Sequence, residues 1–197
     1  MAQAKLQLPN NYQLVLASQS PRRKELLSNL GYNFTQRLKQ VDESYPNDLK
    51  PESVAEYLSR KKSEAYENDI TDNEIIITSD TVVLLDGNIL GKAKDKVEAT
   101  NMLGLLSGKK HRVISGVSLL KKGKRKSFSV VTTVYMKNLS PEEISFYVTN
   151  FRPFDKAGAY GIQEWIGYVG VEKIEGSFYN VMGLPLKELY EELNNFF

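Results

Sequence analysis

The 197-residue chain has the composition of a folded protein, with 41% hydrophobic and 25% charged residues. It contains no cysteine and one histidine, which excludes disulfides, thiolate catalysis and metal sites built from cysteine or several histidines. A net charge of +2 is too small to favour nucleic acid or an acidic membrane surface as a partner. Residues 1–13 lack the apolar core of a secretory signal and no segment resembles a membrane span, so we expect a cytoplasmic protein.

The segment Ser18–Arg23 follows the apolar run Leu14–Ala17 and carries the first chemical signal. Ser20 is a helix N-cap followed by proline, so the sequence predicts a strand, a tight turn and a short helix. Arg22 and Arg23 then lie in the first helical turn, where the helix dipole disfavours cations. This placement favours a bound anion, held by backbone N–H groups as well. A solvated basic turn is the alternative.

The rest of the chain alternates between strands and helices. The expected strands are Asn33–Val41, Glu74–Thr78, Val82–Leu85, Ile89–Leu90, Arg112–Leu120, Ser127–Met136 and one or two within residues 165–174. The expected helices run from Pro51 to about Glu67, over Lys96–Leu106, from a capping box at Ser140 to about Thr149, and over Pro185–Asn194. Helices mixed with at least two hairpins indicate one α/β domain with a mixed sheet. The lysines around Gly123 are expected to decorate a hairpin tip.

Lys62 falls on the apolar stripe of the helix that begins at Pro51, four residues after Leu58 and four before Tyr66. A lysine facing the core needs an anionic partner or must extend its ammonium group to the rim. The sequence leaves both readings open.

Asp80 follows the apolar run Ile75–Ile77, and residues at the carboxyl ends of strands line the ligand crevice of open α/β sheets. A carboxylate there can hold a divalent metal or orient water, or it can simply cap a turn. Asp42 and Glu43, in the preceding loop, are candidate partner carboxylates. Lys92 is an equally open candidate.

The segment Asp155–Gln163 is rich in glycine and alanine, which indicates close approach of its backbone to other backbone or to a ligand. Gln163 has both a donor and an acceptor with which to read a nucleobase edge. A plain tight loop is the alternative. Taken together, the cations, carboxylates and amide match what a nucleoside triphosphate and a metal ion require.

Five segments, in chain order, resemble motifs of the Maf family of nucleoside triphosphate pyrophosphatases: Ser18–Arg23, Ser79–Val82, Leu106–Gly108, Asp155–Gln163 and Val181–Leu186. The resemblance implies a mixed twisted sheet with helices, in two lobes around a central cleft, as in inosine triphosphate pyrophosphatases. The implied reaction cleaves a nucleoside triphosphate between its α and β phosphates, with Mg²⁺ or Mn²⁺ as cofactor. Its products are a nucleoside monophosphate and pyrophosphate.

Carried over position by position, the resemblance implies that Asp80 is the catalytic carboxylate. It assigns phosphate, metal or catalytic roles to Ser18, Arg23, Glu43, Lys62 and Lys92. Arg22, Thr81 and Gln163 match the branch that hydrolyses dTTP and UTP. Arg152 and Ala93 depart from the family pattern, in which an acidic residue and a proline are common, without touching this set.

The charges suggest how such a site would work. Arg22, Arg23, Lys62 and Lys92 would offset much of the roughly four negative charges of a triphosphate. Glu43 and Asp80 would hold the metal, while Asp80 orients or deprotonates the attacking water. The sequence leaves open which carboxylate accepts the proton, and whether modified pyrimidine triphosphates are substrates. A nucleotide-binding regulator of cell division with little turnover is the alternative function, and the oligomeric state, homodimer included, is open.

Overall fold

The computed structural model describes Leu6 and residues 8–197. Within these residues, no helix has the length and apolar character that a membrane crossing requires. Residues 1–5 and 7, which belong to the segment expected to lack a secretory signal, lie outside the described residues.

The described residues form a mixed sheet in the hydrogen-bonded order β2-β1-β3-β5-β6-β7, with β4 paired to β3. Its strands are β1 (Gln13–Leu16), β2 (Phe34–Gln36), β3 (Glu74–Leu85), β4 (Asn88–Leu90), β5 (Lys110–Lys121), β6 (Lys124–Met136) and β7 (Val171–Glu175). β1 pairs in parallel with β2 and β3, whereas β4 and β7 pair antiparallel to β3 and β6. The prediction of a mixed α/β sheet is therefore confirmed.

The helices begin largely where the sequence placed their caps. They are the short 3₁₀ helices η1 (Pro9–Asn11) and η2 (Pro51–Ser53), then α1 (Pro21–Asn29), α2 (Val54–Glu64), α3 (Lys96–Leu106), α4 (Pro141–Phe151), α5 (Trp165–Gly170), α6 (Phe178–Met182) and α7 (Leu186–Asn194). The Ser20 hydroxyl accepts from the N–H of Arg23, and Ser140 forms the predicted capping box with Glu143.

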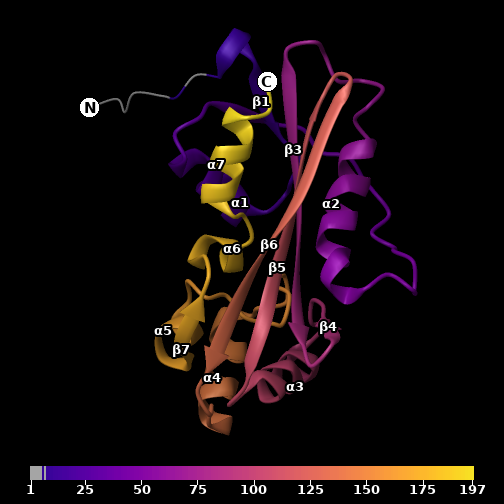
Figure 1. Ribbon diagram of the computed structural model, residues 1–197. Coiled ribbons are helices and arrows are strands. Elements are labelled where there is room, and N and C mark those ends of the chain that lie inside the picture. The colour runs from indigo at the N-terminus through magenta and orange to yellow at the C-terminus, as the bar shows by residue number, and fades with distance from the viewer. Residues whose placement is uncertain (1–5, 7) are drawn as a thin grey trace. The chain divides into compact units, whose positions relative to one another are not determined.

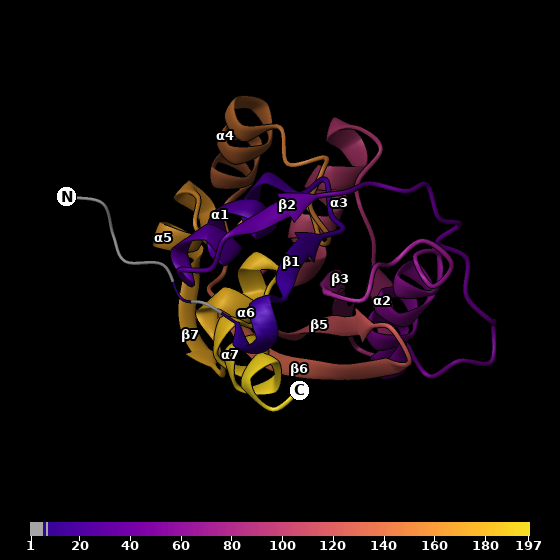
Figure 2. The same ribbon diagram turned by 90° about the horizontal axis from the view of Figure 1, so that it is seen from above.

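The chain divides into two compact units, and β3, β5 and β6 contribute residues to both. The first unit comprises the described residues up to Asp80 together with Ser115–Val130 and Gly183–Phe197. β2, β1 and β3 follow one another across its sheet (Figure 2), and α2 runs beside β3 (Figure 1). In part of its core, Val15 of β1 and Ile76 of β3 pack with Tyr66, which follows α2.

The second unit comprises Thr81–Ile114 and Val131–Met182. A single apolar cluster joins its strands to its helices, with Val83, Leu103, Tyr147 and Ile166 among its fully buried members. The predicted hairpin after Leu85 is confirmed, because Asp86 and Gly87 both adopt the positive φ angles that such a two-residue turn requires.

The basic run around Gly123 lies at the tip of the β5–β6 hairpin, as expected. Two of its lysines form ion pairs within the first unit. Lys122 pairs with Asp72 at 2.7 Å, and Lys126 pairs with Glu192 at 3.0 Å. These residues therefore form surface ion pairs at the hairpin tip, where the sequence predicted them.

Two predicted elements were wrong in their bounds, and a third was confirmed only in part. β3 runs without a break through Ser79–Thr81, because the polar side chains of this stretch find partners on neighbouring elements. The strand expected over Asn33–Val41 is only three residues long, and its remainder continues as loop. Of the one or two strands expected within residues 165–174, β7 is confirmed. The residues before it form α5, since the N–H groups of Gly167 and Tyr168 bond to the Glu164 carbonyl as the first turn of a helix.

Candidate active site

The alternation of side chains along β3 sends its polar residues to opposite faces. The hydroxyl of Thr78 donates to the Ser59 carbonyl of α2 at 2.6 Å, and Asp80, two residues later, also meets α2. Ser79, between them, donates to the Gly183 carbonyl at 3.4 Å. Register along one strand thus places Asp80 against α2.

Lys62 is the partner of Asp80. Its Nζ lies 2.6 Å from Oδ1 of Asp80 and 2.9 Å from Oε1 of Glu43. The side chains of Lys62 and Asp80 are only 17% and 15% exposed, whereas that of Glu43 is 59% exposed. The lysine on the apolar stripe of α2 therefore has anionic partners, as one of the two readings required.

Asp42 and Glu43 are adjacent in sequence but have different partners. Asp42 accepts hydrogen bonds from Ser44 and lies 3.0 Å from Lys61, and these contacts, that with the Ser44 hydroxyl above all, lower the pKa of Asp42 to about 2. Glu43 alone of the two reaches Lys62. The prediction of Glu43 as the partner carboxylate fits this arrangement, and Asp42 belongs to a separate surface pair.

Arg23 lies at the start of α1 and is bound mostly by backbone carbonyls. Its Nε donates to the Gly183 carbonyl at 2.9 Å, and its Nη1 donates to the Ser79 carbonyl at 2.9 Å. Burial lowers the pKa of Arg23, and the negative charge of Asp80 acts in the opposite direction. Arg23 therefore brings a partly buried positive charge to the neighbourhood of Asp80 while joining three chain segments.

Ser18 and Arg22 complete the first-unit group. The buried Ser18 hydroxyl accepts the Ser20 N–H at 3.2 Å and also lies 3.4 Å from Nη1 of Arg23. Arg22 is half-buried, and its charge contributes to lowering the pKa of Arg23. The structure thus gathers Ser18, Arg22, Arg23, Glu43, Lys62 and Asp80, all of which the sequence predicted, within the first unit.

The other predicted residues belong to the second unit. Thr81 follows Asp80 directly and is half-buried, and Lys92 is exposed next to a β-bridge between its backbone and Ala157. The Gln163 amide oxygen is buried and, among the described residues, has no hydrogen-bond partner. Burying an unsatisfied carbonyl is costly, so this atom is suited to a ligand.

The donor set fits a divalent cation of the magnesium type. Magnesium ions at phosphate sites are usually bound by one or two carboxylates and by the substrate's own oxygens. Glu43 and Asp80 supply two carboxylates around one ammonium nitrogen. Within the described part of the chain, no group of three or more histidine or acidic side chains is placed to hold a metal alone.

Sequence reasoning missed the backbone partners of Arg23. The Gly183 carbonyl lies 160 residues away in the chain, and a carbonyl carries no side-chain signal. The resemblance motif Val181–Leu186 contains this glycine and was the available clue.

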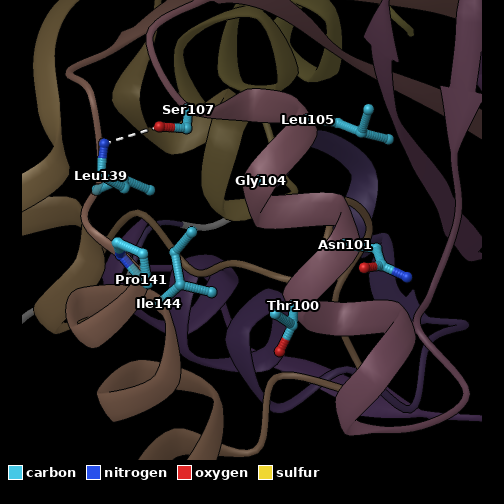
Figure 3. A pocket seen from close by; sticks show the side chains of 8 residues that line it. All are labelled: Thr100, Asn101, Gly104, Leu105, Ser107, Leu139, Pro141 and Ile144. Carbon is cyan, nitrogen blue, oxygen red and sulfur yellow. Dashed lines mark hydrogen bonds between the residues drawn. The ribbon is translucent and has the colours of Figure 1, made fainter.

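A separate pocket lies between α3 and α4 in the second unit (Figure 3). Thr100, Leu105, Pro141 and Ile144 line it, and the Ser107 hydroxyl accepts the Leu139 N–H beside it at 2.7 Å. Its lining contains no titratable side chain, so it does not offer the chemistry of the Lys62–Asp80 group.

Comparison with known proteins gives consistent relatives. The family model described as Maf-like protein matches residues 13–196. The dTTP/UTP pyrophosphatase of Bacteroides thetaiotaomicron is 52% identical over 185 residues, covering 93% of this chain and 96% of that protein. The protein of the same name from Porphyromonas gingivalis is 51% identical over 188 residues, covering 94% of each chain. That of Christiangramia forsetii is 46% identical over 187 residues, covering 95% of each.

A solved structure supports the fold. The Ham1 protein of Staphylococcus aureus superposes with a TM-score of 0.51 at 17% identity, covering 91% of this chain and 99% of that one. At this identity the likeness concerns the fold alone.

Proposed function

The chain belongs to the family of Maf-like proteins, and we propose that it is a nucleoside triphosphate pyrophosphatase acting on dTTP and UTP. The observation that carries this proposal is the close contact of Lys62 with Asp80 and Glu43. In this group Asp80 can act as a general base, the ammonium group suits phosphate, and the two carboxylates suit a metal ion. The names of relatives about 50% identical to this chain support the choice of substrates.

Cations of the first unit bind the phosphates in this proposal. Arg22 and Lys62 supply positive charge to the phosphate oxygens, together with N–H groups at the start of α1. Arg23 is largely engaged by the carbonyls of Ser79 and Gly183, so it acts by holding these segments and by its charge. Ser18 fixes the turn before α1, and Lys92 supplies a further cation.

Asp80 orients the attacking water and accepts its proton. The water oxygen forms a bond to the α phosphorus. The bond from that phosphorus to the oxygen bridging the α and β phosphates breaks, and the bridging oxygen leaves as part of pyrophosphate. Lys62 offsets the repulsion between Asp80 and Glu43 before substrate arrives. Little covalent chemistry is required beyond positioning and charge stabilisation.

Glu43 and Asp80 would hold the divalent cation, Mg²⁺ or Mn²⁺. When bound, the cation would neutralise phosphate charge and polarise the phosphoryl oxygens. The Glu43 side chain is more exposed than that of Asp80, so we assign it chiefly to the metal.

Gln163 reads the base. Uracil and thymine present a carbonyl beside an N3–H group, which an amide can match with one acceptor and one donor. The buried Gln163 amide oxygen without a partner supports this role. Arg22 and Thr81 are the other residues proposed to set the pyrimidine preference.

Product analysis tests the proposal. The purified protein is incubated with Mg²⁺ and a panel of canonical and modified triphosphates, and the products are separated by anion exchange. We expect UTP and dTTP to give the monophosphate and pyrophosphate in equal amounts. Release of a diphosphate and orthophosphate would contradict it. Tight UTP binding without turnover would instead favour the nucleotide-binding regulator of cell division.

A further inference from the structure

The loop that carries Gln163 is fastened to α4 by a buried tyrosine. The Tyr147 side chain is fully buried, and its hydroxyl donates to the Glu164 carboxylate. The same hydroxyl accepts the N–H of Gly161 at 3.0 Å. One phenol therefore fixes the loop on both sides of Gln163.

Lys156 closes this arrangement from the other side. Its Nζ lies 3.0 Å from Oε1 of Glu164 and 2.8 Å from Oδ1 of Asp155, and its side chain is 10% exposed. A Cβ at Gly161 would lie 2.9 Å from Cδ of Glu164 and 3.1 Å from Cε of Lys156. The ion pair and the loop backbone are thus packed in direct contact.

The start of the loop is fastened as firmly. The N–H of Gly158 donates to the Gly91 carbonyl at 2.9 Å, beside the bridge between Lys92 and Ala157. The Tyr160 hydroxyl is 2.7 Å from Nε2 of the buried His111. The loop is therefore held along its whole length within the second unit.

Gln163 itself combines a fixed backbone with an unsatisfied side chain. Its carbonyl accepts the Tyr168 hydroxyl at 2.6 Å, while its amide oxygen is buried without a hydrogen-bond partner among the described residues. A fixed backbone next to an unsatisfied acceptor is the arrangement expected of a pre-organised recognition group.

We propose that Tyr147, Lys156 and Glu164 are positioning residues, which hold Gln163 in the orientation that distinguishes uracil and thymine from cytosine. The inference rests on the proposed function, because it assumes that Gln163 reads the base. A buried ion pair contributes little net stability compared with an apolar packing of the same volume, so a role in fixing one conformation accounts for its presence. None of the three needs to touch the substrate.

Tyr147→Phe is the direct test, because it removes one hydroxyl and keeps the ring. The quantity measured is the ratio of kcat/KM for UTP to that for CTP. We expect the ratio to fall roughly tenfold, through a higher KM for UTP more than a lower kcat, since Tyr147 contacts the loop assigned to the base and none of the residues assigned to the phosphates. A wild-type ratio in a folded Tyr147→Phe protein would overturn the inference.

Tyr135→Phe is the matched control. The Tyr135 hydroxyl donates to Glu175 at 2.8 Å, and Glu175 also pairs with Lys173, so the same three residue types meet at an exposed place. This variant should keep the wild-type ratio. If both variants lowered the ratio equally, the effect would not come from the loop and the inference would be overturned.

A Gln163→Ala background separates this inference from the proposed function. If Gln163→Ala lowers the ratio and Tyr147→Phe lowers it no further in that background, the tyrosine acts through Gln163. Equal effects of Tyr147→Phe in both backgrounds would overturn the inference and leave base reading intact. An unchanged ratio in Gln163→Ala alone would contradict base reading itself.

Should Tyr147→Phe fail to fold, Glu164→Gln is measured in the same two backgrounds, with the same expectations.

Discussion

Lys62 and Asp80 meet across the interface of α2 and β3, with Nζ and Oδ1 separated by 2.6 Å. The same ammonium group lies 2.9 Å from Glu43, so one cation is shared by two carboxylates. The cation and the two carboxylates proposed to act on the phosphoanhydride are therefore in contact with one another.

Lys62→Met should abolish most activity and also destabilise the protein. Without the ammonium group, the poorly exposed Asp80 carboxylate loses its partner and faces Glu43. We expect the free energy of unfolding to fall by roughly 1–3 kcal/mol at pH 7. Urea denaturation and UTP turnover measure the two effects.

Lys61→Met is the matched control, because Lys61 precedes Lys62 on the same helix and pairs with the exposed Asp42. It should change stability by less than about 0.5 kcal/mol and turnover by less than about twofold. Adding Asp80→Asn to Lys62→Met should recover most of the lost stability. A Lys62→Met protein as stable as wild type would show that the pair does not stabilise the fold.

The sequence predicted the polar chemistry better than the paths of the loops. Lys62 was identified because a lysine on an apolar stripe needs an anionic partner or must extend to the rim, and the structure shows two anionic partners. Helical periodicity does not say which anion, since Asp42 and Glu43 are adjacent and only the fold of their loop turns one toward Lys62.

Local signals also failed where tertiary contacts override propensity. The run Trp165–Val169 has the composition of a strand but forms α5, which packs Ile166 into the core of the second unit. Ser79–Thr81 has the composition of a turn but continues β3. By contrast, the caps at Ser20 and Ser140 depend on residues three apart and could be predicted.

Arg23→Lys should lower stability more than Arg22→Lys. The Arg23 guanidinium donates from two nitrogens to the carbonyls of Gly183 and Ser79, a geometry that one ammonium group does not reproduce. We expect a loss of roughly 1–3 kcal/mol for Arg23→Lys. Thermal unfolding of both variants measures the difference, and equal midpoints would contradict the anchoring role.

His111 should stay neutral well below the pH at which a free histidine gains its proton. Burial lowers the pKa of His111 from 6.5 to about 4. Because the chain has a single histidine, its imidazole signals in an NMR titration of the untagged protein need no assignment. A midpoint near 6.5 would contradict the burial of this ring beside Tyr160.

The same shift makes stability depend on pH. Between pH 6.5 and about 4 the unfolded chain binds a proton at His111 that the folded chain does not. His111 therefore destabilises the folded state progressively as pH falls through this window, by roughly 3 kcal/mol at its lower end. His111→Gln keeps a side chain able to bond Tyr160 and should lose less stability than wild type over that range. Equal pH dependence of the two proteins would refute this account.

Gln163→Glu should weaken pyrimidine selectivity more than phosphate binding. The substitution keeps the length of the side chain, removes its donor and adds a negative charge near an N3–H and carbonyl edge. We expect the UTP-to-CTP ratio of kcat/KM to fall roughly tenfold or more. Inhibition by pyrophosphate reports phosphate binding and should change less than threefold. An unchanged ratio would assign the preference to other groups.

The most direct test of the active-site assignment is the rate of pyrophosphate release from UTP by Asp80→Asn. The substitution preserves shape while removing the charge that accepts the proton and holds the cation. Asp86→Asn is its control, because Asp86 lies just beyond β3 and pairs with Lys109 at 3.4 Å as an exposed residue. We predict at least about a hundredfold loss for a folded Asp80→Asn protein and less than about twofold for Asp86→Asn. Near wild-type turnover in Asp80→Asn would contradict the assignment of Asp80 as the catalytic carboxylate.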